Sequence, residues 1–253
     1  MPWDAASWRP ASNSAQPGKA RSPAAQGVPP TFRAAGPLAA TDGCYNPDMS
    51  KARAKKIKLL LLDVDGVMTD GKLYFVPLPG AKLPPGTEHK LGQGGYGIPG
   101  EAVEVKAFHA HDGTGFSLAR LGGIKTGLIT KRISETVRLR ARDLKIEFVY
   151  QGSANKLQAL HDILQKTGLK AEEVAFVGDD IIDLPVMRAC GLAIAVANAR
   201  EDVKDEAHVI TDHRGGEGAV RDAVEYILKA QGTLTRAVEA YISDRTSIDE
   251  KFQ

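Results

Sequence analysis

The sequence has 253 residues, 43% of them hydrophobic and 25% charged, values typical of a globular protein that one domain can accommodate. Its formal net charge of +2 is too small to indicate a nucleic-acid partner, and no apolar run approaches the roughly 20 residues that cross a bilayer. Cys44 and Cys190 lie far apart without metal-ligand spacing, and the first residues lack a secretory signal, so we expect a cytoplasmic protein.

The first 52 residues differ in composition from the rest of the chain. They are rich in Ala, Pro, Ser and Gly and show no apolar periodicity. Such a segment cannot bury enough apolar surface to offset the entropy of ordering, so residues 1–52 are predicted to be a disordered extension. A start assigned too early, with Met49 as the true initiator, is an alternative. The predicted folded domain spans residues 53–232, and residues 233–253 are expected to form a C-terminal helix or tail.

Short apolar runs alternate with helical patterns through the predicted domain. This alternation predicts an α/β fold with a doubly wound parallel sheet and helices on both faces. The predicted strands are Ile57–Leu62, Lys125–Ile129, Ile146–Val149, Val174–Val177 and Leu192–Val196. The predicted helices are Gly115–Leu121, Ser134–Asp143, Asn155–Thr167, Ile181–Ala189 and Gly218–Ala230.

One region interrupts the α/β rhythm. Lys72–Val76 and Val103–Phe108 alternate like strands and predict a hairpin that projects from the sheet as a flap. Between them, Pro77–Gly100 is crowded with Gly and Pro and predicts a long inserted loop. Leu73, Phe75, Val103 and Val105 are the apolar positions of this hairpin, and we expect them to be buried against something.

The first predicted strand ends in a pair of acids. Asp63 and Asp65 follow Leu60–Leu62 at positions i and i+2, and Gly66 comes next. Ligands of open parallel sheets bind beyond the carboxyl ends of the strands, which is where these acids stand. One carboxylate can attack phosphorus, and a second one nearby can protonate the leaving oxygen and then activate water. Solvated acids before a turn are the structural alternative.

Three further segments place polar groups just after a strand. Thr130 follows one strand, Lys156 lies in the first turn of a helix, and Asp179 and Asp180 end another strand with Asp183 one helical step later. Each has a structural alternative: an N-cap for Thr130, a solvated residue for Lys156, a helix start for the acids. Gathered at the ends of neighbouring strands, several carboxylates suit magnesium, which binds oxygen ligands and keeps some of its waters.

These motifs together resemble the haloacid dehalogenase (HAD) superfamily of aspartate-nucleophile phosphatases. The matching set is Asp63-x-Asp65, Thr130, Lys156 and Gly178-Asp179-Asp180-x-x-Asp183. Within the superfamily, the chain from about Lys58 to Gln231 resembles the phosphatases of 3-deoxy-D-manno-octulosonate 8-phosphate, which have a hairpin flap and no cap domain. The finer match is carried by Asp63–Gly71, Ala107-Phe108, Asp112-Gly113, Tyr150–Gly152, Gly178–Met187 and Gly215–Arg221.

The resemblance implies a role for each matching residue. Asp63 would be the nucleophile and a magnesium ligand, and Asp65 the general acid and base, with its backbone carbonyl on the metal. Thr130 and Lys156 would hold the transferred phosphoryl group, and Asp179 would complete the metal site. Asp180 and Asp183 would orient that site. The remaining substrate contacts would come from Arg132, His109, His111, Asp112 and Gly113, besides Asp65 and Lys156.

Two departures from the family pattern concern the substrate. Thr130-Lys131-Arg132 stands where the family has Thr-Gly-Arg, and His109-Ala110-His111 stands where it has Asn-Val-Arg. An arginine that would pair with the sugar carboxylate is thereby missing. The two histidines alternate in a segment that is predicted to be strand-like, and they are interpreted as substrate-facing or solvated side chains. The expected substrate is an acidic sugar phosphate, with a nine-carbon sialic-acid-type sugar as the alternative to the eight-carbon one.

Two expectations concern assembly and rival functions. The resemblance implies a homotetramer around the hairpin, in which a neighbouring subunit covers each open site. A receiver-like signalling domain phosphorylated on aspartate also uses strand-end acids, magnesium, a Thr or Ser and a Lys. Its acceptor aspartate, however, sits on a later strand, and here the strand Ile146–Val149 is followed by Tyr150. The phosphatase is therefore the favoured function.

Overall fold

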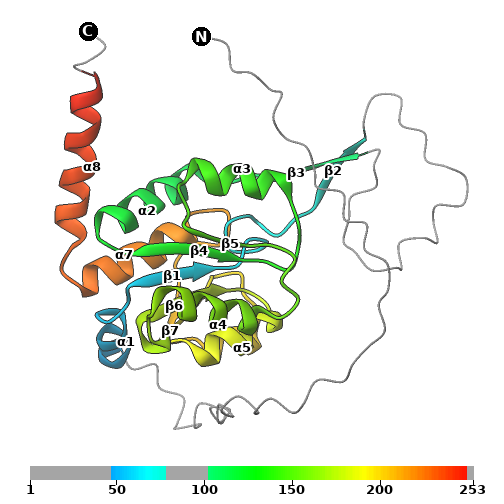
Figure 1. The fold of residues 1–253 in the computed structure, drawn as a ribbon, viewed down its shortest axis with the longest axis horizontal. Coiled ribbons are helices and arrows are strands. Elements are labelled where there is room, and N and C mark those ends of the chain that lie inside the picture. The colour runs from blue at the N-terminus through cyan, green and yellow to red at the C-terminus, as the bar shows by residue number, and fades with distance from the viewer. Residues whose placement is uncertain (1–46, 78–101, 250–253) are drawn as a thin grey trace, which may run out of the picture. The chain divides into compact units, whose positions relative to one another are not determined.

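The computed structural model of the chain describes residues 47–77 and 102–249, and its centre is a six-stranded parallel sheet (Figure 1). The strand order is β5-β4-β1-β6-β7-β8. If the six strands of this sheet are numbered 1 to 6 in chain order, this is the 3-2-1-4-5-6 order of a doubly wound fold. The strands are β1 (Leu59–Leu62), β4 (Lys125–Ile129), β5 (Phe148–Tyr150), β6 (Val174–Gly178), β7 (Leu192–Ala195) and β8 (Val209–Ile210).

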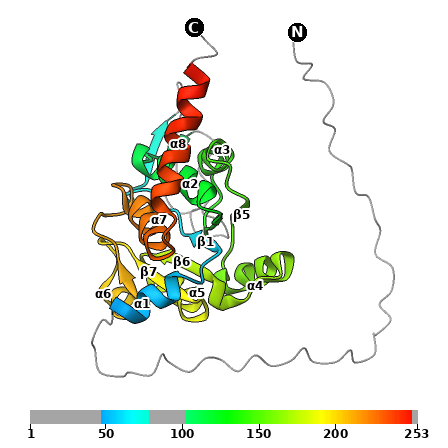
Figure 2. The ribbon, with the colours of Figure 1, turned by 90° about the vertical axis from the view of Figure 1, so that its left-hand side faces the viewer.

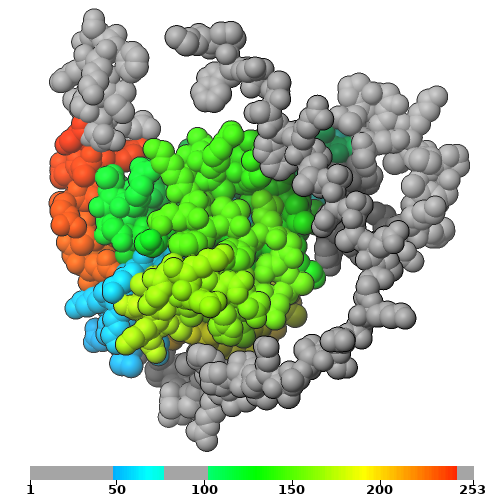
Figure 3. Space-filling view, viewed as in Figure 1, coloured from blue at the N-terminus to red at the C-terminus, as the bar shows by residue number. Residues whose placement is uncertain are grey.

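Two helical layers cover this sheet. Figure 1 shows α2 (Ala110–Leu121) and α3 (Glu135–Asp143) on one face and α4 (Lys156–Thr167) and α5 (Leu184–Ala189) on the other. In the space-filling view, the green to yellow-green part of the chain that includes α2, α3 and α4 forms the surface toward the viewer (Figure 3). The other helices are α1 (Pro47–Ala54), α6 (Glu201–Lys204), α7 (Ala219–Ala230) and α8 (Leu234–Asp249), with 3-10 turns at Ala171–Glu173 and Ile181–Asp183.

The sequence explains why the central strands are parallel and buried. β1 consists of four leucines, all fully buried, and all five residues of β6 are buried as well. A strand that is covered on both faces needs such a continuous apolar run. Polar caps define where helices start: the side chains of Ser134 and Asn155 accept hydrogen bonds from the amides of Val137 and Gln158. The predicted α/β fold is thus confirmed.

The hairpin is formed by β2 (Tyr74–Pro77) and β3 (Ala102–Val105), which are antiparallel. Tyr74 pairs with Val105, and Val76 pairs with Val103, so these four side chains share one face. All four are between 44% and 53% exposed in the chain. We call them the outer hairpin face. Leu73 and Phe75 were expected to be buried together with Val103 and Val105, but the register puts Phe75 on the opposite face, with Glu104, and Leu73 and Phe75 are 46% and 45% exposed in the chain.

Several elements differ from the prediction. The helix α1 includes residues before 53, within the segment that was predicted to be disordered, and Ser50 and Arg53 hydrogen-bond to the carbonyls of His208 and Gly191. The short α6 and β8 were not predicted, because one helical turn and a two-residue strand are too short to show the period of a helix or a strand. Residues 1–46, including Cys44, and most of the Pro77–Gly100 loop lie outside the described residues.

The C-terminal segment contains a helix, as expected. α8 follows α7 after a short turn and packs against α2 and α7. Figure 2 shows this arrangement in the view turned by 90°. Over the described ranges, none of the helices is long and apolar enough to span a membrane.

Candidate active site

The strand order places the candidate site at the middle of the sheet. β1 and β6 are neighbours, with Leu62 paired to Val177, and the connections run in opposite directions from this point. Side chains that follow these two strands therefore meet at the topological switch point, where doubly wound sheets bind ligands. Asp63 follows β1 and donates its backbone amide to the carbonyl of Val177 at 3.0 Å, and Asp179 follows β6.

Asp63 lies at the bottom of the site. Its side chain is only 6% exposed, and Oδ2 is 2.7 Å from the Nζ atom of Lys156. Its other oxygen, Oδ1, accepts a hydrogen bond from the amide of Val64 at 2.7 Å. Burial raises the pKa of the Asp63 carboxyl to about 6, although Lys156 acts in the opposite direction. A fixed, desolvated carboxylate of this kind is placed to act as a nucleophile.

Lys156 reaches this carboxylate from the first turn of α4. Its side chain is 2% exposed and forms a second ion pair, also at 2.7 Å, with Oδ1 of the fully buried Asp183. The cation lies at the positive end of a helix, where its charge is unfavourable, and the two carboxylates compensate for that position. The structure thus brings Lys156 next to Asp63, and its contact with a phosphoryl group stays a prediction.

Asp183 holds the acids of the second strand end in place. Its Oδ2 atom accepts hydrogen bonds from the amides of Asp179 and Asp180 at 3.0 and 3.3 Å. Both of its oxygens are thereby engaged by protein groups. This geometry supports the expected orienting role of Asp183 rather than a role as a metal ligand.

The site fits a divalent cation on structural grounds. Oxygens of Asp63, Asp179 and Asp183 lie within 4.8 Å of one another. Oδ1 of Asp179 is buried and makes no hydrogen bond within the described residues. Burial, with the charges of Asp183 and Asp63, raises the pKa of Asp179 to about 8. A hard cation would satisfy the unpaired oxygen and remove the repulsion between these carboxylates.

Asp65 points away from that acidic group. Its carboxylate forms a close ion pair with Lys106 and lies 3.7 Å from Nε of Arg132. Its side chain is 19% exposed, compared with 6% for that of Asp63. Of the predicted metal ligands, Asp65 does not contribute its side chain to the acidic cluster, and only its backbone carbonyl stays a predicted ligand.

Gly66 is required by the way the two strand ends meet. Its φ of +92° is in the left-handed region, and a Cβ atom here would stand 2.0 Å from Oδ2 of Asp179. The side chain of Asn198 fixes the same turn by donating to the Gly66 carbonyl at 3.1 Å and accepting from the amide of Gly215 at 2.6 Å. Asn198 was missed in the sequence because no motif marks it.

Thr130 and Arg132 follow β4, the neighbour of β1. The Thr130 hydroxyl is buried and accepts a hydrogen bond from the Arg132 amide at 3.3 Å. The guanidinium of Arg132 donates to Glu104 at 3.1 Å. Both residues therefore lie at the same end of the sheet as Asp63, and their contacts with a phosphoryl group or a sugar stay predictions.

The segment that contains the predicted substrate contacts His109, His111, Asp112 and Gly113 is helical, not strand-like as predicted. His109 and His111 do not lie on a strand: His109 is the N-cap of α2, and His111 is in its first turn. Their rings meet edge to face, with centroids 4.8 Å apart. Asp112 is buried and accepts a hydrogen bond from the Arg221 amide at 2.9 Å, and Gly113 packs next to Arg140. The contacts within the chain thus join α2 to α7 and α3, and substrate roles for these residues stay predictions.

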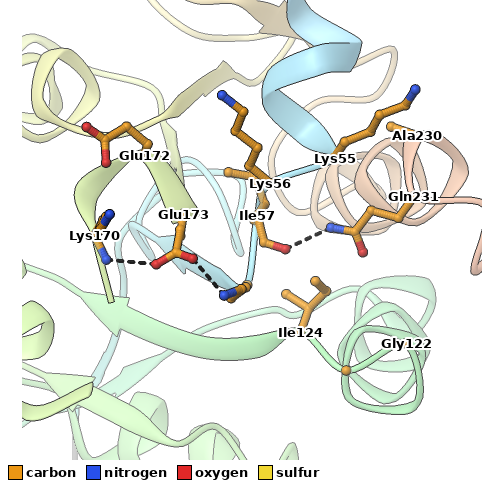
Figure 4. Close-up of a pocket in the computed structure, with 12 residues that line it drawn as sticks. Lys55, Lys56, Ile57, Gly122, Ile124, Lys170, Glu172, Glu173, Ala230 and Gln231 are labelled. Carbon is orange, nitrogen blue, oxygen red and sulfur yellow. Dashed lines mark hydrogen bonds and ion pairs between the residues drawn. The ribbon is translucent and has the colours of Figure 1, made fainter. Parts of the chain in front are cut away.

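A hollow of about 880 Å³ lies elsewhere, lined by residues that include Lys56, Gly122, Lys170 and Gln231 (Figure 4). Ile57, Ile124 and Glu173 also line it, and each stands just before a strand. This hollow is therefore at the amino ends of the strands, opposite to Asp63. Glu173 hydrogen-bonds to the Lys170 amide and pairs with Lys58, and no group from the chemistry above reaches this place.

Comparisons with known proteins agree with this geometry. Residues 128–223 match the family model of haloacid dehalogenase-like hydrolases. The chain is 40% identical to the 3-deoxy-D-manno-octulosonate 8-phosphate phosphatase KdsC of Escherichia coli, over 77% of this chain and 92% of that protein.

Two solved structures of such phosphatases are also similar. One, from Yersinia pestis, is 37% identical, with a TM-score of 0.64 over 74% of this chain and 89% of that one. The other, from Moraxella catarrhalis, contains a magnesium ion, a phosphate ion and a KDO molecule. It is 33% identical, with a TM-score of 0.66 over 78% of this chain and 99% of that one.

Proposed function

The chain belongs to the 3-deoxy-D-manno-octulosonate 8-phosphate phosphatases, a family of haloacid dehalogenase-like hydrolases, and on that premise we propose that it hydrolyses this sugar phosphate with the help of magnesium. The observation that carries the proposal is the buried group of Asp63, Lys156, Asp183 and Asp179 at the switch point of the sheet. The sheet order also argues against a receiver domain, because receivers have the 2-1-3-4-5 order.

Asp63 performs the first displacement. Its carboxylate oxygen attacks phosphorus, the bond from phosphorus to the sugar oxygen breaks, and an aspartyl phosphate forms. Asp65 gives a proton to the departing sugar oxygen, which leaves as an alcohol. The position of Asp65 suits this role because it is the more exposed of the two acids and stands two residues from the nucleophile.

The second displacement regenerates the enzyme. Asp65, now ionised, takes a proton from a water molecule that attacks the same phosphorus atom. The bond to Asp63 breaks, inorganic phosphate leaves, and both carboxyl groups return to their starting states. Lys156 neutralises charge next to Asp63 in both steps, and Thr130 donates its hydroxyl to a phosphoryl oxygen.

Magnesium would be held by the side chains of Asp63 and Asp179 and by the backbone carbonyl of Asp65. When bound, it neutralises the phosphoryl oxygens as their charge develops. The unpaired Oδ1 atom of Asp179 supports this assignment.

The substrate is assigned from the relatives, with Arg132 as the residue of this chain that supports it. Arg132 lies 3.7 Å from Asp65, and we propose that its guanidinium contacts a hydroxyl or the carboxylate of the sugar. His109 and His111 stand where relatives have other residues, and they leave the nine-carbon sugar acids as the competing substrates.

We also propose that the protein acts as a homotetramer in the cytoplasm. The outer hairpin face presents Tyr74, Val76, Val103 and Val105 to solvent in the single chain. An isolated hairpin is only marginally stable, and a contiguous apolar face of this kind favours pairing with copies of itself.

A turnover screen tests the proposed activity. The full chain is assayed with 3-deoxy-D-manno-octulosonate 8-phosphate, a nine-carbon sugar-acid phosphate, a nucleotide and a phosphoamino acid, each with magnesium and with excess chelator. We expect the eight-carbon acid to give the highest kcat/KM and the chelator to abolish turnover. Faster hydrolysis of the nucleotide or the phosphoamino acid would contradict the assignment.

A further inference from the structure

The inner face of the hairpin carries two buried ionic residues that the reaction above does not use. Along β3, Val103 and Val105 are exposed, whereas Glu104 between them is 4% exposed and Lys106 just after the strand is 8% exposed. A strand that alternates in this manner presents one face to the surroundings and the other to the domain. Glu104 and Lys106 are on the side that faces Asp65 and Arg132.

Four ionic side chains form a closed network there. Lys106 makes a close hydrogen bond to Oδ1 of Asp65, and its Nζ is 3.2 Å from Oε1 of Glu104. The same Oε1 atom accepts a hydrogen bond from Nη2 of Arg132 at 3.1 Å, and Nε of Arg132 lies 3.7 Å from Oδ2 of Asp65. Glu104 thus joins the two cations that flank the Asp65 carboxylate. The formal charges of the four residues cancel when Asp65 is ionised, which suits their burial.

The two oxygens of Asp65 are held differently. Oδ1 is fixed by Lys106, whereas Oδ2 is beyond hydrogen-bond distance of Arg132. An aspartate that follows a strand at a tight turn could otherwise rotate and present either oxygen. Proton transfer requires one oxygen within hydrogen-bond reach of the leaving group, so a fixed rotation of the carboxylate raises the rate of that step.

We propose that Lys106 and Glu104 are positioning residues of the hairpin, which clamp Oδ1 of Asp65 so that Oδ2 faces the leaving oxygen of the substrate. Lys106 acts on Asp65 directly, and Glu104 acts through Lys106 and Arg132. The proposal deepens the proposed phosphatase function and rests on it. It makes the flap part of the proton-transfer apparatus as well as a wall of the site.

The network has two other interpretations, and both predict different kinetics. If it only anchors the hairpin, its loss should lower the rate of every substrate by the same factor. If Lys106 only binds the sugar, its loss should raise KM for the sugar acid and leave small phosphate esters unaffected. Positioning of a general acid predicts a third result, because only substrates with poor leaving groups need the proton.

The test is the dependence of kcat/KM on leaving-group pKa for a series of substituted phenyl phosphates with magnesium. These esters have no sugar to bind, and kcat/KM reports the first displacement. The variants are Lys106→Met and Glu104→Gln, with Asp65→Asn as the reference for a lost acid. Lys125→Met and Glu147→Gln are matched controls, because that pair is also 3.2 Å apart but lies on the surface.

We expect Lys106→Met and Glu104→Gln to make kcat/KM depend more steeply on leaving-group pKa, with a slope closer to that of Asp65→Asn. The loss should be roughly 10- to 100-fold for the poorest leaving group and under about threefold for nitrophenyl phosphate. Lys106→Met combined with Asp65→Asn should be no steeper than Asp65→Asn alone. The surface controls should follow the wild-type line.

The proposal would be overturned if both variants kept the wild-type slope. This holds whether kcat/KM falls by the same factor for every ester or only the KM for the sugar acid rises. Glu104→Gln keeps the size of the side chain, so it provides the result if Lys106→Met does not fold, as judged by circular dichroism. A wild-type chain that hydrolyses none of these esters would instead contradict the phosphatase function itself.

Discussion

The Nζ atom of Lys156 lies 2.7 Å from Asp63 and 2.7 Å from Asp183, so one buried cation joins the proposed nucleophile to the residue whose carboxylate accepts a hydrogen bond from the Asp179 amide. The contact links two strand ends that are more than a hundred residues apart in the sequence. Because a phosphate dianion must approach the Asp63 carboxylate, the positive charge of Lys156 offsets a repulsion that would otherwise oppose the attack.

Lys156→Met should therefore lower kcat by about 10²- to 10³-fold, the usual cost of losing one charged donor at a reacting centre. The measurement is steady-state hydrolysis of the sugar phosphate. Lys166→Met, on the same helix but with its amine on the exposed Tyr150 hydroxyl, is the control and should keep wild-type turnover. Equal activity of the two variants would show that Lys156 has no role in the reaction.

Asp63→Asn should abolish turnover and leave the fold intact, because the amide has the shape of the carboxylate but cannot attack phosphorus. We expect a loss of at least about 10⁴-fold, comparable to the removal of other catalytic nucleophiles. Asp205→Asn, an exposed carboxylate outside the site, controls for a general effect of the substitution. Substantial turnover by a folded Asp63→Asn protein would exclude the covalent route.

Magnesium should change the way stability depends on pH. In the metal-free protein, burial and neighbouring acids raise the pKa of Asp179 from 3.8 to about 8. Between pH 3.8 and about 8, the folded state therefore binds more protons than the unfolded state. The contribution of Asp179 to the free energy of unfolding is fully present below its unfolded pKa and is lost as the pH rises through about 8. We expect a loss on the order of 1–3 kcal/mol, because Asp179 is only partly shielded from solvent.

Saturating magnesium should reverse this loss, and the increase in Tm that it causes should be larger at pH 8 than at pH 6. Thermal unfolding with and without the metal provides the measurement. Asp179→Asn should remove both effects, whereas Asp205→Asn, which changes an exposed carboxylate outside the site, should keep them. A magnesium-induced Tm shift that is independent of pH and unaffected by Asp179→Asn would place the metal elsewhere.

Val103→Asp should weaken self-association through the outer hairpin face. Val103 is 48% exposed in the single chain, and a charge in an apolar contact between subunits is costly. Light scattering at micromolar concentration should show smaller particles for this variant than for the wild-type protein, which we propose to be a tetramer. Leu139→Asp, on α3 and 42% exposed, should leave the assembly unchanged. A wild-type monomer with full activity on the sugar acid would contradict the proposed tetramer.

The strand-end residues could be predicted from the sequence because one rule places them. Parallel strands bring their carboxyl ends to one edge, so Asp63, Lys156 and Asp179 meet at the centre of the sheet whatever the loops do. Glu104 and Lys106 were missed because their strand was interpreted through its apolar residues. The alternation of Val103, Glu104, Val105 and Lys106 contains the signal, but only the register of the hairpin shows which side faces Asp65.

Other features depend on tertiary contacts that no local pattern specifies. α1 forms at Pro47–Ala54 because Ser50 and Arg53 bond to carbonyls near the far strands, 158 and 138 residues away in sequence. His109 becomes an N-cap, although its side chain makes no capping hydrogen bond, so the strand-like alternation of His109 and His111 was misleading.

The central claim is that phosphate passes through Asp63 on its way to water, and the stereochemical course at phosphorus tests this most directly. The full chain, with magnesium, hydrolyses a phosphorothioate analogue of the sugar phosphate, made chiral by sulfur and two oxygen isotopes, in water that carries the third oxygen isotope. Two successive in-line displacements, first by Asp63 and then by water, predict overall retention of configuration at phosphorus. Inversion would mean that water attacks the substrate directly and would contradict the account.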